Sequence, residues 1–525
     1  MDKMITFLLL VAAFFILSPA MLAQNGLTSE QEIGKAIFFD NISSPDRMAC
    51  ATCHGPAVGF TGPIPGINKH GAVYRGAVPK RFGNRKPPSA GYATLSPLFD
   101  YDDSEDLFFG GNFWDGRATG WKLGNPAADQ ALGPFLNPVE QNNPSKEAVL
   151  KQIAKSKYRH LWESVWGEPI SYDTPAEIEM NYDRVGLSIA EYEASTEVNQ
   201  FTSKYDYYLA NEVSLTSQEM QGLVLFEGQA MCSNCHISEP GPNGEPPLFT
   251  DFTFDNLGVP KNPENPFYDM DKVYLDNGDP INPLGEAWID YGLGDFLRQL
   301  AADDSWKSLP HVTANVAGMT PVQLEALSYQ NDGKQKVPTL RNVDKRNGNN
   351  FPKAYAHNGY FSSLEEITHF YNTRDVENAG WNGIPWPDPE VPGENVNTDE
   401  LGNLGLTADE EAALVAFMKT LSDGYIPSNP PAMAKSNNKV ASLQVVGPNP
   451  FNPETKFLYT VSKPGYVKIE AFNITGQRMV TLANDWKLAG EYSINWNAAQ
   501  FPGGIYFIRL ITNHEVLVKK VSLIK

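Results

Sequence analysis

Cysteine is rare in this chain of 525 residues, and positive charge is in the minority. The sequence has four cysteines, and 41 lysines and arginines stand against 62 acidic residues, for a net charge of −21. Such a negative charge argues against nucleic acids and anionic membrane surfaces as partners. The length predicts two to four domains, and the hydrophobic content of 42% is enough for real cores.

Long apolar runs are absent beyond the N-terminus, which leaves no second candidate for a membrane span. Residues 1–23 predict a signal peptide: Lys3 is followed by an apolar run, Ser18-Pro19 breaks the run, and small Ala23 precedes Gln24. An uncleaved anchor is the alternative. We therefore expect the chain to be exported, to the periplasm or the cell surface.

All four cysteines fall in two motifs of the same spacing, Cys50-Ala51-Thr52-Cys53-His54 and Cys232-Ser233-Asn234-Cys235-His236. The pattern C-x-x-C-H is typical of covalent c-type haem, with two thioether bonds and the histidine as proximal iron ligand. A zinc site usually needs four clustered ligands, and a redox dithiol does not need the histidine. The sequence therefore predicts two haem c groups, attached at Cys50, Cys53, Cys232 and Cys235, with His54 and His236 bound to iron.

An internal repeat precedes the two motifs. Leu27-Thr28-Ser29 leads to Gly34 and Phe38, and Leu215-Thr216-Ser217 leads with equal spacing to Gly222 and Phe226. Capping pairs predict helix starts at Ser29 with Glu32, Thr216 with Glu219, and Thr407 with Glu410 before a helix over 412–421. We expect a mainly α fold with long loops, divided into two c-type cytochrome domains at 24–200 and 201–424.

The composition changes after Tyr425. Residues 425–441 are rich in proline, serine and asparagine, which predicts a linker. Short alternating runs then predict strands at 456–461, 466–472, 491–496, 505–511 and 516–524. Residues 442–525 should therefore form a small all-β Ig-like sandwich.

This tail resembles the C-terminal sorting domain of the type IX secretion system. The matching words are Pro448-Asn449-Pro450-Phe451-Asn452-Pro453, Asn473-Ile474-Thr475-Gly476, Gly504-Ile505-Tyr506 and Lys519-Lys520-Val521. The resemblance implies the type IX machinery as a partner and transport across an outer membrane. A plain Ig-like adhesive module is the alternative.

The core resembles the bacterial di-haem cytochrome c peroxidase and MauG family over nearly all of residues 27–424. Besides the haem motifs, the dispersed matches are 34–40 (GKAIFFD), 84–89 (NRKPPS), 113–118 (FWDGRA), Gly133-Pro134, 137–140 (NPVE) and 337–343 (VPTLRNV). The resemblance implies a peroxidase that reduces hydrogen peroxide with electrons from a small donor protein, a cytochrome c or a cupredoxin. It also leaves a homodimer open.

The resemblance implies unequal haems. At the haem of His54, Glu140 matches a catalytic distal glutamate and Gln130 a distal glutamine, while Trp114 matches the tryptophan between the two haems. One carboxylate beside peroxide can act as base and then as acid. His70 follows His54 by sixteen residues, the spacing of a removable distal ligand, although a surface loop histidine is an equal alternative.

At the haem of His236, the family's usual second ligand is a methionine fourteen residues after the histidine that is His357 here. That position holds Tyr371, as in MauG. A phenolate donor would lower the iron potential, whereas a thioether raises it. Met270, Met319 or an open site are the alternatives. Tyr371 motivates a second hypothesis, a MauG-like oxidase acting on a protein or small molecule, and a non-enzymatic surface electron carrier is the third.

A calcium ion is also implied between the haem domains. Asn84 matches its side-chain ligand, and backbone carbonyls near Pro352 and Ala354 match the others. Oxygen donors of this kind suit calcium.

Overall fold

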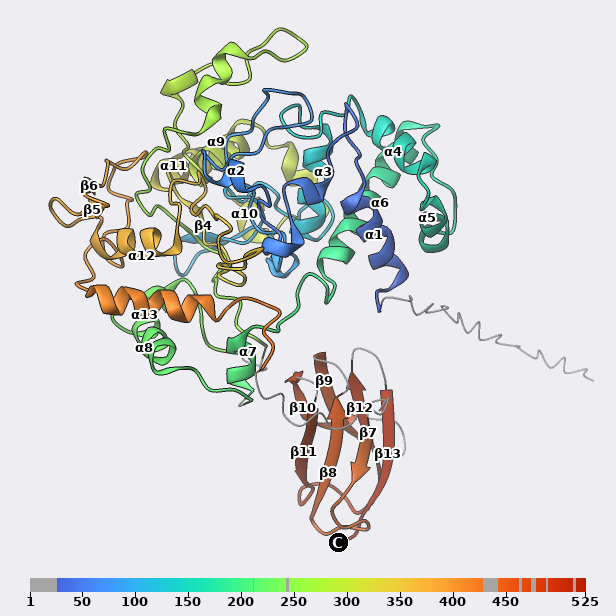
Figure 1. Cartoon of the computed structure of the whole chain (residues 1–525). Helices are drawn as coiled ribbons and strands as arrows, with labels where there is room; N and C mark the ends of the chain where they lie inside the picture. Colours follow the sequence, from blue (N-terminus) through green and yellow to red (C-terminus); the bar gives the residue numbers. More distant parts are fainter. Residues whose placement is uncertain are drawn as a thin grey trace, which may run out of the picture.

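A computed structural model describes residues 26–210, 212–241, 245–427, 442–461, 465–473, 478–487, 490–512 and 516–525. The predicted signal peptide and most of the predicted linker lie outside these residues. Within them, no helix is both long and apolar enough to cross a membrane. Figure 1 shows a helical region with long loops, followed along the chain by an all-β region.

The first half of the helical region has its core at Ile33, Phe38, Leu150, Trp162 and Ile189. Its helices are α1 (Ser29–Phe39), α2 (Pro65–Asn68), α3 (Pro126–Leu136), α4 (Lys146–Lys155), α5 (Arg159–Trp166) and α6 (Pro175–Glu193). The predicted cap of α1 was wrong by one residue. Thr28 is the N-cap and forms a capping box with Gln31, because the Gln31 side chain reaches the Thr28 amide.

The second half has its own core around Phe226, Phe249, Phe361, Phe370 and Phe417. Its helices are α7 (Lys204–Leu209), α8 (Ser217–Glu227), α9 (Leu293–Ala302), α10 (Ala314–Ala317), α11 (Pro321–Gln330), α12 (Leu364–Thr373) and α13 (Ala408–Lys419). The capping boxes at Thr216 and Thr407 are confirmed, although α13 begins four residues earlier than predicted. A further cluster joins Phe99 and Trp121 to Phe296, so side chains of both halves share one core.

The sequence repeat corresponds to a repeated helix crossing. α1 packs on α6 at Gly34, where an added Cβ would lie 1.8 Å from the Ser188 carbonyl oxygen. α8 packs on α13 at Gly222, where it would lie 2.0 Å from the Ala413 carbonyl oxygen. Each crossing needs glycine because the backbones touch. The two halves therefore use the same device to hold the helix that precedes each haem motif.

We expect Gly34→Ala to destabilise the protein by about 2 kcal/mol or more, because the methyl group must push two packed helices apart. Gly66→Ala is the matched control, since no heavy atom lies within 4 Å of its added Cβ. Urea unfolding followed by circular dichroism measures the difference. Equal unfolding midpoints for the two variants would contradict the close crossing.

Strands are scarce in the helical region, as predicted. Those present are two or three residues long: β1 (Asp100–Asp102), β2 (Leu107–Phe109), β3 (Phe254–Asp255), β4 (Gln335–Lys336), β5 (Gly380–Trp381) and β6 (Ile384–Pro385). They pair as β1–β2, β3–β4 and β5–β6. The β3–β4 pair joins distant loops and places Lys336 close to the functional site described below.

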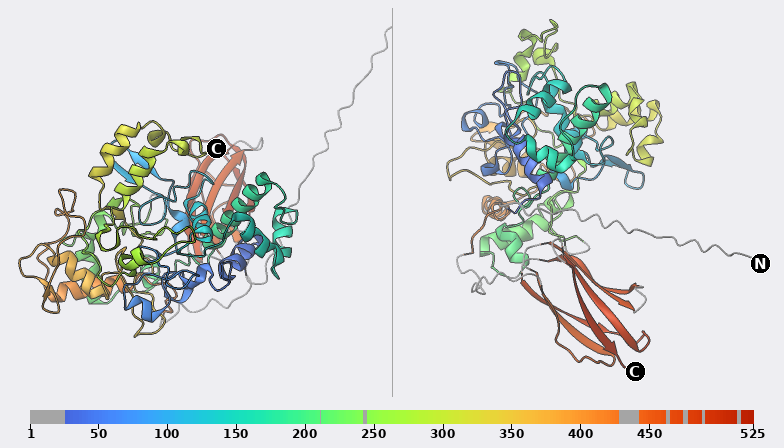
Figure 2. Two further views of the ribbon diagram at one scale, coloured as in Figure 1. Left: turned by 90° about the horizontal axis from the view of Figure 1, so that it is seen from above. Right: turned by 90° about the vertical axis from the view of Figure 1, so that its right-hand side faces the viewer.

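The all-β region forms two antiparallel sheets with a shared core that includes Phe457, Ile469, Trp496, Ile508 and Val521. Its strands are β7 (Ser442–Val445), β8 (Glu454–Val461), β9 (Gly465–Asn473), β10 (Arg478–Lys487), β11 (Gly490–Asn497), β12 (Gly504–Thr512) and β13 (Val516–Leu523). One sheet has the order β10-β9-β12-β13 and the other β11-β8-β7. Figure 2 shows the all-β region from two further sides. Five strands were predicted, and β7 and β10 were missed. The Ig-like assignment stays a prediction.

Candidate functional site

Each half of the helical region contains one cavity beside a haem motif. The C-terminal cavity is lined by Cys232, Cys235 and His236, together with Tyr371 from α12. The N-terminal cavity is lined by His54 and by Gln130 from α3. The two haem motifs therefore lie beside different cavities, as two cofactors require.

Backbone carbonyls orient both histidines. Nδ1 of His54 lies 3.2 Å from the Phe60 carbonyl oxygen, and Nδ1 of His236 lies 2.8 Å from that of Phe249. A carbonyl can only accept, so Nδ1 carries the proton and Nε2 keeps the lone pair that binds a metal. Burial also lowers the pKa of both imidazoles, which favours the neutral form. Both rings therefore fit an iron ligand.

The cysteines lie on single turns of 3₁₀ helix, η1 (Cys50–Thr52) and η4 (Cys232–Asn234). None of the four forms a disulfide. Burial raises the pKa of the Cys50 and Cys232 thiols to about 12, whereas a redox-active dithiol needs a lowered pKa. Two inert thiols, one turn apart and followed by an oriented imidazole, fit covalent haem attachment.

Trp114 forms part of the wall of both cavities. Its indole Nε1–H donates to the Lys86 carbonyl oxygen at 2.8 Å, and its own carbonyl accepts from the Lys336 amide at 2.7 Å. The ring also contacts His357 edge-on, with centroids 6.4 Å apart. Trp114 is therefore an aromatic side chain held in the wall that the two cavities share.

A buried ionic network fixes the loop that carries Trp114. Arg85 donates to both carboxylate oxygens of Asp290, at 2.7 and 2.6 Å, and to Asp115 at 2.5 Å. Bidentate pairing of this kind is geometrically specific. Because Asp115 follows Trp114 directly, the network joins the tryptophan loop of the first half to the Asp290 loop of the second.

Glu140 follows α3 in a tight turn, in which Asn137 Nδ2 donates to its Oε1 at 2.8 Å. Burial raises the pKa of the Glu140 carboxyl, against the opposing effects of Arg117 and Asn137. Its charge in turn contributes to the raised pKa of Cys53, which places it beside the first haem motif. Glu140 itself is not part of the cavity wall, unlike Gln130.

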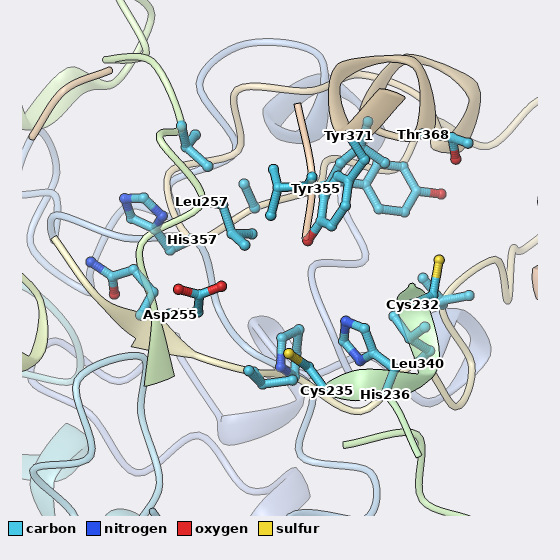
Figure 3. A pocket seen from close by; sticks show the side chains of 18 of the residues that line it. Cys232, Cys235, His236, Asp255, Leu257, Leu340, Tyr355, His357, Thr368 and Tyr371 are labelled. Carbon is cyan, nitrogen blue, oxygen red and sulfur yellow. The ribbon is translucent and has the colours of Figure 1, made fainter. Parts of the chain in front are cut away.

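Tyr371 lies in the C-terminal cavity, whereas neither of the predicted alternatives does. Figure 3 shows the Tyr371 side chain and the His236 ring on opposite walls. Burial raises the pKa of the Tyr371 phenol strongly, with further contributions from Asp255 and the cysteines. Met270 and Met319 are buried elsewhere, Met319 in the cluster around Phe99. Met418 of α13 also borders this cavity, and the sequence reasoning missed it.

Two predicted metal ligands are not brought to the cavities. The His70 side chain is 75% exposed and lies 3.4 Å from Glu264, so its binding to iron stays a prediction. The Pro352 carbonyl, expected as a calcium ligand, accepts from the Asn68 amide at 3.0 Å, and the Asn84 carbonyl accepts from Asn265. No cluster of three or more His, Cys, Asp or Glu side chains in the described residues could hold a metal. The calcium site also stays a prediction.

The structure adds three buried ionisable side chains that the sequence reasoning did not single out: Lys86, Lys336 and Glu193. Both lysines border the C-terminal cavity, and Lys336 borders the N-terminal one as well, with Glu193 of α6. Lys86 lies inside the matched 84–89 segment, and Lys336 directly precedes the 337–343 segment. Membership of these segments was the only signal that could have identified them.

Comparison with known proteins agrees with this arrangement. The family model described as di-haem cytochrome c peroxidase matches residues 28–214. The methylamine utilization protein MauG of Paracoccus denitrificans is 33% identical over 401 residues, which cover 74% of this chain and 88% of that protein. The cytochrome-c peroxidase IdrP2 of Denitromonas iodatirespirans is 27% identical, with coverages of 76% and 83%.

The crystal structure of the diheme peroxidase BthA from Burkholderia thailandensis matches with a TM-score of 0.57 and 28% identity. The matched region covers 75% of this chain and 86% of the BthA chain. Residues 446–525 match the model of a secretion system C-terminal sorting domain, which indicates an exported protein. Two cavities with C-x-x-C-H motifs, a MauG relative over most of its length and a sorting domain together show that this chain is an exported oxidoreductase of the di-haem cytochrome c peroxidase and MauG family, with two covalently bound haem c groups.

Proposed function

We propose that the protein reduces hydrogen peroxide to water at the haem of His54, with electrons that an external donor delivers to the haem of His236. The observation that carries this proposal is the difference between the two cavities. Gln130 and Glu140 lie at the first haem motif, whereas the second cavity has Tyr371 opposite its histidine. BthA, which is 28% identical, is described as a diheme peroxidase.

The acid–base work falls to Glu140. A buried carboxyl with a raised pKa can take a proton from one peroxide oxygen and return it to the oxygen that leaves as water. The hydrogen bond from Asn137 fixes its direction. Gln130, which is always neutral, can orient peroxide through its amide without exchanging protons. Trp114 connects the two cavities and is the route for the electron.

A MauG-like oxidase is the second candidate, and Tyr371 favours it. In that case the two haems held by His54 and His236 would supply oxidising equivalents for a protein or small-molecule substrate. The same P. denitrificans relative that shows the family is a methylamine utilization protein. The peroxidase is the first candidate because the carboxyl and amide at the first motif can supply the proton transfer and orientation that peroxide cleavage needs.

Steady-state assays of the haem-loaded protein test the proposal. After reduction of one haem, we expect turnover of hydrogen peroxide with a reduced c-type cytochrome or a cupredoxin as donor, measured by oxidation of the donor. The assay should be repeated without prior reduction, to detect a closed first haem. Absence of turnover in both states, with fast electron exchange, would favour a simple electron carrier instead.

A further inference from the structure

Five cations lie in or near the walls of the two cavities, and they differ in the contacts of their charged groups. Arg341 and Lys353 are buried, whereas Lys86 and Lys336 are half-buried and border the cavities. Arg85 pairs with Asp115 and Asp290, and Arg341 pairs with Asp206. Lys353 donates to the three carbonyl oxygens of Val58, Asn342 and Lys345, at 3.0 to 3.1 Å. Lys86 and Lys336 have no acidic side chain within ion-pair distance among the described residues. Within the same described residues Lys353 also forms no ion pair but has three carbonyl acceptors, whereas Lys86 and Lys336 have fewer acceptors, and the charge of Asp251 acts on Lys336 only from beyond ion-pair distance.

Lys336 projects between the cavities. Its ammonium donates to Ser96 Oγ at 2.6 Å and to the Gly111 carbonyl oxygen, both in the first half of the helical region. It also lies 5.2 Å from the centre of the Phe252 ring. These contacts are to neutral groups. They use only some of the three N–H donors of the Lys336 ammonium and bring no negative charge to it. Burial lowers the pKa of Lys336 to about 7, and the charge of Asp251 opposes this effect only in part.

Lys86 is placed similarly but borders only the C-terminal cavity. Its ammonium lies 5.7 Å from the centre of the Trp114 ring and makes one long contact, of 3.5 Å, to the Pro87 carbonyl. The backbones of both lysines form hydrogen bonds with Trp114. Both lysines therefore lie at the wall that the two cavities share.

A buried ammonium without a partner is costly, and a structure usually retains one only where an anion completes it. Each haem c carries two propionate carboxylates, so two haems bring four negative charges into this interior. We propose that Lys86 and Lys336 bind these propionates, Lys86 at the haem of His236 alone and Lys336 at both haems. The proposal depends on the two haems and not on which substrate is turned over.

The assignment predicts a specific pattern of reduction potentials. Removing a positive charge next to a propionate favours the ferric form, because the oxidised haem carries one more positive charge. We expect Lys336→Gln to lower the equilibrium constant for reduction of each haem about tenfold. For a one-electron couple this lowers the reduction potential by ~59 mV. Lys86→Gln should lower the potential of the His236 haem and leave that of the His54 haem nearly unchanged.

Glutamine retains hydrogen-bond donors without the charge, and Lys336→Arg and Lys86→Arg retain the charge. Potentials are measured by optical titration, with electron paramagnetic resonance at poised potentials to assign each haem, after covalent haem content has been confirmed. Lys122→Gln is the control, since Lys122 is a partly buried lysine paired with Glu179 and Asp183 away from both cavities.

We expect the arginine variants to keep potentials close to those of the wild type. Potentials of both glutamine variants that match the control would overturn the proposal, as would a Lys86→Gln shift confined to the His54 haem. If Lys336→Gln fails to retain haem, haem retention by Lys336→Arg supports the charge. Loss of haem in both Lys336 variants, with unchanged potentials in Lys86→Gln, would also overturn it.

Discussion

Replacement of Glu140 by glutamine should lower peroxide turnover by about 100-fold or more while both haems stay attached. Glutamine keeps the size of the side chain and its contact with Asn137 but cannot take up and return a proton. Turnover of the wild type should also fall as the pH falls through the raised pKa of Glu140, because only the carboxylate can act as base. The variant should lack this dependence.

Glu193→Gln is the matched control for Glu140. Glu193 is a second buried carboxyl and borders the N-terminal cavity, and burial raises its pKa to about 8. It is therefore mostly neutral at pH 7, and a neutral amide of the same shape should change turnover by less than about tenfold. Stopped-flow measurements of peroxide reaction and steady-state rates separate the two variants. Equal losses in both would show that Glu140 has no special position.

The sequence was most informative where local chemistry sets the structure. Two capping boxes were predicted to the residue, and the glycines of the repeat mark the two close helix crossings. At α1 two side chains compete, because Thr28 and Ser29 can both cap. The Gln31 side chain accepts from the Thr28 backbone amide, and this contact stabilises Thr28 as the N-cap of α1.

Strand prediction failed where the period of two is interrupted. β10 pairs with β9 through two register shifts, between Arg478 and Val480 and between Thr481 and Ala483, so its backbone pairing is irregular. β7 has only four residues and borders the predicted linker, so it is too short to show a period. Periodicity detects a strand only when pairing is regular over several residues.

Contacts between distant segments were beyond sequence reasoning. Lys86 and Lys336 are 250 positions apart, and each appeared as an ordinary polar residue beside a motif. The β3–β4 pairing brings Lys336 to Trp114, and the bond from the Trp114 indole brings in Lys86. The sequence thus singled out some residues of each cavity, such as His54, Gln130, His236 and Tyr371, but not the two lysines of the wall between them.

Replacement of Tyr371 by methionine should raise the potential of the His236 haem by about 0.1 V or more, if Tyr371 is its second axial ligand. A thioether favours reduced iron and an anionic phenolate favours oxidised iron, and axial ligands set haem potentials over a wide range. Tyr371 faces His236 across the cavity, so a methionine at this position would lie on the wall opposite the histidine. Tyr371→Phe should instead leave this position open.

Tyr355→Phe is the control, because Tyr355 borders the same cavity but points its hydroxyl at Arg346, at 3.2 Å. Optical titration gives the potentials, and electron paramagnetic resonance reports whether ligation changes. An unchanged potential in both Tyr371 variants would exclude the phenolate ligand and leave Met418 and Met231, which also border this cavity, as the next candidates to test. A raised potential in Tyr371→Met should speed electron acceptance from the donor and weaken any oxidase activity, because a haem of higher potential is reduced more readily and retains stored oxidising equivalents less well. The same substitution therefore separates a peroxidase from an oxidase by which of the two activities the wild-type tyrosine supports.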